Sequence, residues 1–397
     1  MSTPQNPLPL GGDFLADPHA SYAALRRTGS VHRAVDPDGG PLFLVTRYQD
    51  VRAAAADRRL SVSKRYARAA RGHVHSMPAE LDAHLLNSAP ATHARLRRLV
   101  GTAFTPRRTE SLREAVRQAA DQLLDTMASK DRADVATDLA IPLSMTVICD
   151  LMGVPSDDRP DFRRWTDTLL SSEPGAPQRS REAMREMHRF LAHLIDRKRV
   201  APGEDLLSAL IAARDEGDRL SEDELVAMAF LVLFGGYDNT ASLITTSVLA
   251  LLTHPRHLVA VRTGELAMDA VTEEVLRWNP PTMLAVRRFA TEDIEIDGTA
   301  IPAGERVWLS WAAANRDPAR FAEPDAFDPH REDTKHLSFG HGSHFCPGAA
   351  LARMENTIAV TSLVRRFPQL ALLGSADDLR WTASLRSRSL RSLPVSL

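Results

Sequence analysis

The chain has 397 residues, of which 44% are hydrophobic and 25% are charged. This composition is ordinary for a globular protein and excludes collagen-like, disordered and disulfide-stapled chains. The 49 basic residues nearly balance the 51 acidic ones, and the formal net charge of −2 gives no bulk attraction to nucleic acid or anionic lipid. We therefore expect neither a nucleic-acid partner nor a membrane partner.

Cysteine usage and the N-terminus indicate the compartment. Two cysteines, Cys149 and Cys346, are too few for a disulfide framework, which favours a reducing environment. The first ten residues contain neither a basic region nor an apolar run of the kind found in signal peptides. The expected location is the cytoplasm.

The first predicted elements are a hairpin and a helix. Residues 31–35 and 42–46 are apolar runs on either side of a turn segment rich in Asp, Pro and Gly. Thr46 and Gln49 have the spacing of a capping box, so a helix is expected to begin there and to run to residue 56.

Proline and glycine residues mark the ends of the remaining predicted helices and strands. Residues 90–277 read as mostly helical, and strands are expected over residues 285–309, with turns at Asp297-Gly298 and at residues 302–304. A last helix is expected over residues 348–367. No repeat or linker is evident, so the sequence predicts one mainly α domain over residues 1–397 with a smaller β part, and residues 1–14 are expected to form a flexible extension.

The segment 225–252 admits two interpretations. It contains one charged residue, Asp238, and as a helix it is long enough to cross a bilayer. Its middle, however, holds glycines and polar residues that are costly in lipid, and Ser221 and Glu224 form a capping box typical of helices in globular proteins. A long buried helix at the centre of the fold is the better interpretation, with a local break expected at Gly235 and Gly236.

The strongest chemical signal is the cysteine segment, residues 339–348. Glycine-rich backbone delivers Cys346 to the start of a helix, where unpaired N–H groups and the helix dipole favour a thiolate, a soft anionic metal ligand. Two alternatives are a buried structural cysteine and a zinc site formed by His341, His344 and Cys346, with His336 as the nearby candidate for a fourth ligand.

The cysteine segment resembles that of the cytochrome P-450 family, in particular its soluble bacterial class. The family pattern Phe-Gly-x-Gly-x-His-x-Cys-x-Gly occurs here in full. The resemblance extends from about residue 15 to the end of the chain and implies the P-450 fold with a long central helix. The matching residues are Phe339, Gly340, Gly342, His344, Cys346 and Gly348.

Further motifs occur in the family's order. Glu274 and Arg277 supply its Glu-x-x-Arg motif, and Arg331 resembles the arginine that completes this structural triad. Taken alone, Glu274 and Arg277 would be read as an ordinary surface ion pair. The order and spacing of the motifs favour the triad.

Three basic residues resemble the family's ligands of the haem propionates. His93 and Arg97 match a histidine and an arginine on one helix, and Arg288 matches an arginine on a strand. Arg95 and Arg98 project in other directions from the same helix, where they could help to dock an acidic electron donor.

The resemblance implies haem b as the cofactor and Cys346 as its axial iron ligand. Such a thiolate pushes electron density toward bound dioxygen and favours heterolytic O–O cleavage. Pro347 has no N–H, so one hydrogen-bond donor to the sulfur is missing, and we expect a lower reduction potential in consequence.

The central helix carries the residues expected to handle oxygen and protons. Gly235 and Gly236 align with the small residues that make room for oxygen beside the haem, and Asp238 aligns with the family's acid. Asn239 stands where an alcohol is usual, and Thr240 is rotated from that position by about 100°. We expect Asp238 to feed protons through water held by Asn239; the alternative is that both merely satisfy a helix kink.

The substrate pocket is the least defined part. The resemblance places Leu284, Ala285 and Val286 along a strand edge over the haem, with a roof from residues 65–86 and 166–194. Basic residues in the first of these segments suggest an acidic or carrier-bound substrate, although a solvated loop is the better interpretation. They are Arg65, Arg68, Arg71, His73 and His75.

The function implied is that of a haem-thiolate monooxygenase, acting on a small and largely apolar natural product such as a polyketide, peptide or terpene. The segment after Cys346 is too short for a fused flavin domain, so electrons are expected from a ferredoxin and its NAD(P)H-dependent reductase. Asn239 keeps open oxidative coupling, desaturation or peroxide-driven chemistry at the same haem. A non-catalytic haem or ligand-binding protein is a third possibility.

Overall fold

The computed structural model describes residues 7–68, 79–101, 104–170, 176–215, 220–382 and 384–397. The chain divides into two compact units. Unit 1 comprises Met1–His75, Asp269–Cys346 and Trp381–Ser389, and unit 2 comprises Ser76–Met268, Pro347–Arg380 and Leu390–Leu397. The single domain expected over residues 1–397 stays a prediction.

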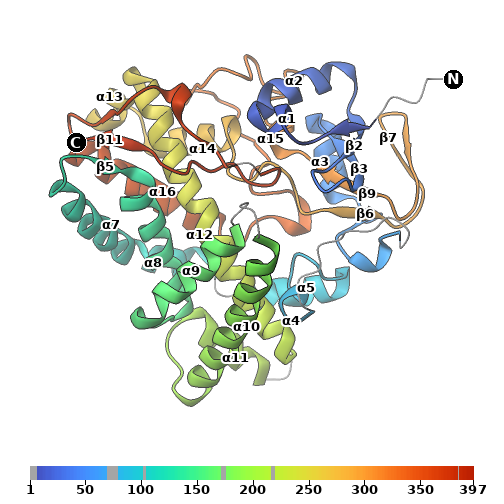
Figure 1. Ribbon diagram of the computed structural model, residues 1–397, viewed down its shortest axis with the longest axis horizontal. Helices are drawn as coiled ribbons and strands as arrows, with labels where there is room; N and C mark the ends of the chain where they lie inside the picture. The colour runs from blue at the N-terminus through green and yellow to red at the C-terminus, as the bar shows by residue number, and fades with distance from the viewer. Residues whose placement is uncertain (1–6, 69–78, 102–103, 171–175, 216–219, 383) are drawn as a thin grey trace. The chain divides into compact units, whose positions relative to one another are not determined.

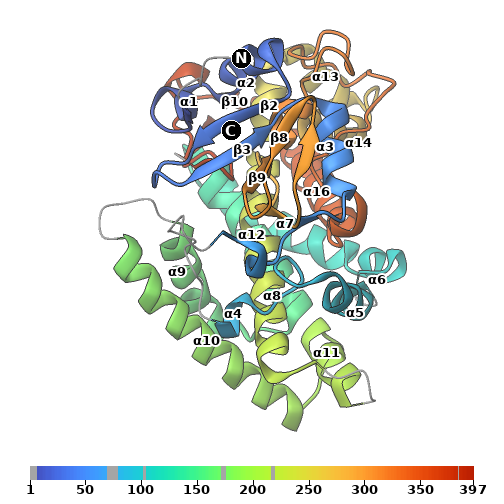
Figure 2. The ribbon, with the colours of Figure 1, turned by 90° about the vertical axis from the view of Figure 1, so that its right-hand side faces the viewer.

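Unit 1 contains the larger sheet, whose strands have the order β1-β2-β3-β9-β6-β4. Strands β2 and β3 pair antiparallel, whereas β3 and β9 pair parallel although they lie far apart in the sequence. Figure 2 shows β2, β3, β8 and β9 with α3 beside them. The elements are β1 (Leu8–Pro9), α1 (Asp13–Ala16), α2 (Pro18–Thr28), β2 (Val31–Val35), β3 (Pro41–Val45), α3 (Tyr48–Ala56), β4 (Leu60–Ser61), α14 (Met268–Trp278), β6 (Arg288–Ala290), β7 (Ile294–Ile296), β8 (Thr299–Ile301), β9 (Arg306–Leu309) and α15 (Trp311–Ala314).

The predicted hairpin and the later strands are confirmed. The turn between β7 and β8 has positive φ at both Asp297 (49°) and Gly298 (71°), a conformation for which an Asp-Gly pair is well suited. Gly304, with φ of 81°, makes the second predicted turn.

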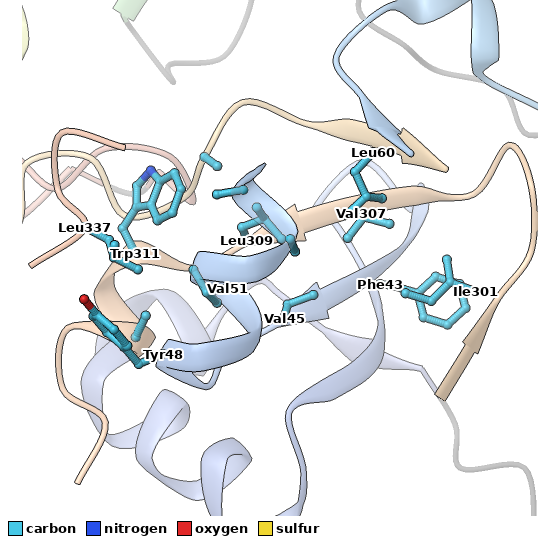
Figure 3. Packing of buried hydrophobic residues seen from close by; sticks show 14 of the residues in the cluster. Phe43, Val45, Tyr48, Val51, Leu60, Ile301, Val307, Leu309, Trp311 and Leu337 are labelled. Atoms are coloured by element: carbon cyan, nitrogen blue, oxygen red, sulfur yellow. The ribbon is translucent and has the colours of Figure 1, made fainter. Parts of the chain in front are cut away.

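Helix α3 covers one face of this sheet. Its Val51 lies over Val45 of β3 and Leu309 of β9, and Trp311 and Leu337 extend the same cluster (Figure 3). Burial of these apolar side chains holds α3 in place.

Two sequence expectations for unit 1 are wrong. Helix α3 begins at Tyr48 without a side-chain cap, because the Thr46 hydroxyl instead donates to the carbonyl of Ser30 at 3.1 Å. The described part of the expected flexible extension is also ordered: Leu8 and Pro9 pair parallel with β2, and Phe14 is buried. Apolar burial and backbone pairing fix this part of the chain.

Unit 2 is mainly helical. Helix α12 packs against α8, α4, α10 and α16, while α9 packs against α10 (Figure 1). A three-stranded sheet has the order β10-β11-β5. The elements are α4 (Ala79–Asp82), α5 (Pro90–Gly101), α6 (Pro106–Ser111), α7 (Arg113–Ala128), β5 (Ala133–Asp134), α8 (Ile141–Met152), α9 (Arg159–Leu170), α10 (Ala176–Val200), α11 (Leu206–Asp215), α12 (Glu222–Thr253), α13 (Pro255–Thr263), α16 (Ala349–Arg366), β10 (Ala371–Leu372) and β11 (Pro394–Ser396).

The expectation of a long buried helix is confirmed by α12. The Ser221 hydroxyl accepts a hydrogen bond from the Glu224 amide at 3.1 Å, and the Glu224 carboxylate accepts one from the Ser221 amide at 2.9 Å, so the capping box is complete. Two stretches, Val135–Met152 and Glu222–Thr253, are long and apolar enough to cross a membrane, but 67% of the most apolar 18-residue window in each is buried inside the protein. Core helices pass the same test of length and apolarity.

The break expected at Gly235 and Gly236 is wrong, because α12 is continuous through them. A Cβ at Gly236 would stand 2.5 Å from Cδ1 of Ile148 on α8. Gly236 therefore permits close helix packing, and this role needs no interruption of the helix.

Candidate functional site

The cysteine segment has a tight backbone in unit 1. Gly340 and Gly342 have φ of 79° and 73°, values that other residues adopt only with strain. The Cys346 amide donates to the Phe339 carbonyl at 2.8 Å, which closes the loop, and the Cys346 side chain is partly exposed. Helix α16 begins at Ala349, with Gly348 at its N-cap, as the sequence predicts to within one residue.

Both alternatives for Cys346 are contradicted. The side chain is not fully buried, so a core role does not account for it. Among the described residues, no three His, Cys, Asp or Glu side chains are placed to hold a metal ion together, and His336 contacts the Glu273 carboxylate at 3.3 Å. The zinc site is therefore not formed.

The structure brings the predicted triad together in unit 1. The fully buried Arg277 guanidinium donates to both carboxylate oxygens of Glu274, at 2.7 and 2.8 Å. Arg331 approaches the same carboxylate at 3.5 Å, and the Asp328 amide donates to it at 2.9 Å. The remaining Arg277 donors reach backbone carbonyls of Asn315, Pro324 and Ala326. This is a buried, well-paired charge network and not a surface ion pair.

His93 and Arg97 lie four residues apart on α5 in unit 2. His93 is buried and Arg97 is partly buried, which agrees with the inward orientation expected from the helical period. Arg95 forms an ion pair with Glu224 of α12, and its part in docking an electron donor stays a prediction. Arg98 is exposed.

Arg288 fits the role expected of a propionate ligand in unit 1. Its side chain is buried on β6, and one guanidinium nitrogen donates to the Leu60 carbonyl at 3.3 Å. Burial lowers the pKa of Arg288 to about 10, opposed by the charge of Asp57. Its Nε has no hydrogen-bond partner among the described residues. A buried cation with an unused donor is suited to an anionic group such as a haem propionate, so the residues present fit a haem.

Helix α12 presents two glycines with opposite surroundings. Gly236 is packed tightly against Ile148, as described above. At Gly235, by contrast, a Cβ would have no atom within 4 Å. The side of α12 that carries Gly235 is therefore open, as the expected oxygen site requires.

Asp238 on α12 is an acid whose protonation is altered by its surroundings. Burial, reinforced by the negative charge of Asp167 on α9, raises its pKa to about 6. Tyr237, the preceding residue, donates its hydroxyl hydrogen to the Asp167 carboxylate at 2.9 Å, and Arg163 lies 3.6 Å from that carboxylate. Asp167 is about half exposed. A half-exposed carboxylate thus lies near Asp238, which is itself partly buried.

Asn239 and Thr240 occupy different environments. The Asn239 side-chain amide donates to the carbonyl of Gly235, one turn earlier, at 3.2 Å. Thr240 is buried. The structure therefore holds the Asn239 amide against the backbone of its own helix.

The residues predicted to line or cover the substrate pocket differ in their burial and contacts. Leu284 and Ala285 are buried in apolar clusters of unit 1, and their place along the substrate pocket stays a prediction. Val286 is partly exposed. In the predicted roof, Arg65 stacks on Tyr66 and Arg68 approaches Glu305, and the segment 166–194 spans parts of α9 and α10. The expected contacts of Arg71, His73 and His75 lie outside the described residues.

Sequence reasoning missed one feature. The hydrogen bond between Tyr237 and Asp167 joins helices that are 70 residues apart in the chain, and no local motif marks it.

The chain is similar to cytochromes P450 over its whole length. The Cytochrome P450 family model matches residues 13–264 and 266–374. Cytochrome P450 monooxygenase PikC of Streptomyces venezuelae is 44% identical over 97% of this chain and 92% of the relative. Polyketide biosynthesis cytochrome P450 PksS of Bacillus subtilis is 36% identical over 98% of both chains.

A solved structure agrees in fold. The tirandamycin C-bound P450 monooxygenase TamI is 40% identical and superposes with a TM-score of 0.91, covering 98% of this chain and all of that one. The mainly helical fold with a smaller β part is thus the P450 fold, as predicted. With the cysteine segment and the buried triad in place, the chain belongs to the cytochrome P450 family of haem-thiolate monooxygenases.

Proposed function

We propose that this protein inserts one oxygen atom from O2 into a small, largely apolar natural product of the polyketide class. The cofactor is haem b, with Cys346 as axial ligand. Electrons come from a ferredoxin and its NAD(P)H-dependent reductase in the cytoplasm. The substrate class is supported by relatives whose names refer to polyketide biosynthesis and to bound tirandamycin C.

The observation that carries the proposal is the backbone of the cysteine segment. Two left-handed glycines and the hydrogen bond from Cys346 to Phe339 present a partly exposed sulfur just before α16. When bound, a thiolate-ligated haem supplies dioxygen activation. His93, Arg97 and Arg288 would hold the propionates, and the triad around Glu274 would keep the supporting backbone of unit 1 rigid.

Proton supply is assigned to Asp238. Because its pKa is raised to about 6, its carboxyl exchanges a proton readily near neutral pH. The partly exposed Asp167 carboxylate beside it is positioned to return protons from solvent. Asn239 would orient a water between Asp238 and the oxygen site. If Asn239→Ala kept full rate and full coupling of reductant to product, this part of the proposal would fail.

The first experiment is the absorption spectrum of the ferrous protein with carbon monoxide. The wild type is expected to show the long-wavelength Soret band of thiolate-ligated haem. Cys346→Ala should lose it, and Cys149→Ala, a change at a buried core cysteine, should keep it. Folded protein that binds no haem when supplied with it would refute the assignment.

Turnover assays separate the remaining functions. Product formation that needs a ferredoxin, its reductase and O2 supports the monooxygenase. Turnover supported by peroxide alone would favour the peroxide-driven alternative that Asn239 keeps open. Haem binding without turnover of any ligand that shifts the spectrum would favour a non-catalytic ligand-binding protein.

A further inference from the structure

His336, which lies just before the cysteine segment in unit 1, has a fixed imidazole ring. Its side chain is 3% exposed. The Ser338 amide donates to Nδ1 of the ring at 3.2 Å, so the ring hydrogen of the neutral form lies on Nε2. Nε2 lies 3.3 Å from a carboxylate oxygen of Glu273 on α14. Because each nitrogen faces a partner, the ring cannot turn without losing one of these contacts.

The chain on either side of the ring is also fastened to unit 1. The Ser338 hydroxyl donates to the Leu276 carbonyl of α14. The Leu337 amide donates to the side-chain oxygen of Asn315 at 2.7 Å, and the Asn315 side-chain amide donates to the Ser338 hydroxyl at 2.8 Å. Asn315 is fully buried. The path of the chain into the cysteine segment is therefore set by α14 and by the residue that follows α15.

Aromatic contacts connect His336 to the cysteine segment. The ring centroids of His336 and Phe339 are 6.0 Å apart, and those of Phe339 and Phe345 are 6.3 Å apart. Both distances are typical of packed aromatic pairs. The Phe339 carbonyl also accepts the hydrogen bond from the Cys346 amide at 2.8 Å, and Phe345 directly precedes Cys346. Phe339 thus contacts the cysteine segment through its ring and its carbonyl, and His336 packs against that ring.

Glu273 and Glu274 are neighbours on α14 that hold different parts of the chain. Glu274 pairs with Arg277 and Arg331, as described above. Glu273 faces His336 instead, since consecutive residues of a helix are rotated by about 100° from each other. The triad secures the chain at Arg331, whereas the contact of Glu273 secures the aromatic residues next to the cysteine. This second attachment is separate from the triad.

We propose that His336, held by Glu273, is a positioning residue for the Cys346 thiolate. The His336 ring fixes Phe339, and Phe339 fixes the cysteine segment in the form that ligates haem iron. The inference rests on the proposed function, because it takes Cys346 as the axial ligand. Groups that orient a metal ligand from behind typically contribute about tenfold to a hundredfold to metal affinity or activity. Loss of the His336 ring should therefore loosen the thiolate from the iron.

The test measures how fast the haem-loaded full chain loses the long-wavelength Soret band of its ferrous carbon monoxide complex. Transfer of haem to apomyoglobin is the second readout. His336→Ala is expected to lose the band, and to release haem, about tenfold faster than wild type. Glu273→Ala should also be faster than wild type. Glu273→Gln should remain close to wild type, because its amide oxygen can still accept from Nε2 of His336.

Two control variants separate positioning from general stability. Glu332→Gln changes an exposed acid in the same part of the chain and should behave as wild type. Ile195→Ala creates a cavity at a fully buried residue of α10 in unit 2. It should lower the urea concentration needed for unfolding while the band is lost at the wild-type rate.

Each outcome decides the proposal. His336→Ala at the wild-type rate overturns it, as does an Ile195→Ala variant that loses the band as fast as His336→Ala. If His336→Ala fails to fold, judged by circular dichroism, equal rates in Glu273→Ala and Glu273→Gln overturn it instead. A wild type without the long-wavelength band refutes the proposed function and this inference with it. A wild type with the band and variants without the expected differences refutes the inference alone.

Discussion

Replacing Asp238 by Asn should stabilise the protein at alkaline pH. The carboxylate of Asp238 is unfavourable in its folded environment because it is buried and lies near the charge of Asp167. An amide of the same shape carries no charge and avoids both penalties. The gain in stability should be larger at high pH than at low pH, because only the ionised carboxyl of Asp238 is unfavourable.

The magnitude follows from the shift of the pKa from 3.8 to about 6. Between these values the folded state binds more protons than the unfolded state, so stability falls as pH rises through this window. Above the window the ionised carboxyl of Asp238 costs about 3 kcal/mol relative to its protonated form, at about 1.4 kcal/mol per pKa unit. At about pH 5, inside the window, roughly half of that cost is present.

The assay is urea unfolding of the wild type and of Asp238→Asn at about pH 8 and about pH 5. The advantage of the variant is expected to be about 3 kcal/mol at the higher pH and about half as large at the lower. Asp167→Asn removes the charge of Asp167 but leaves Asp238 buried, so it should raise the free energy of unfolding at the higher pH by a smaller amount. A difference between Asp238→Asn and wild type that did not change with pH would refute the reasoning.

Three further changes test other parts of the structure. Gly236→Ala should cost about 1–3 kcal/mol because its Cβ meets Ile148, whereas Gly235→Ala, in open space, should not lower stability; urea unfolding of both variants, and rescue of the first by Ile148→Ala, checks the argument. Glu274→Gln should destabilise by about 3–5 kcal/mol because it leaves a buried arginine without its counter-charge, which denaturation and haem retention would detect. Pro347→Leu should raise the reduction potential by adding an N–H donor near the sulfur; an unchanged or lower value in redox titration would remove the idea.

The sequence predicted best what local chemistry determines. The capping box at Ser221, the Asp297-Gly298 turn and the start of the last helix rest on neighbouring residues, and the structure confirms them. The triad around Glu274 was accessible through family resemblance, because its two arginines occupy recognisable positions.

The failures share a different physical cause, since each depends on contacts between distant segments. The Thr46 hydroxyl does not cap the helix because it donates to the carbonyl of Ser30, the residue before β2. The glycines of α12 suggested a break, but Gly236 serves packing against α8.

The hydrogen bonds of Arg277 have an evolutionary consequence. The Arg277 guanidinium donates to the main-chain carbonyl oxygens of Pro324 and Ala326, and every amino acid has such an oxygen. The identities of those two residues can therefore drift without loss of the contacts, provided that the path of the chain is kept. A segment held in this way tolerates sequence divergence, and it offers designers a place to graft new surface residues while the support of the cysteine segment stays intact.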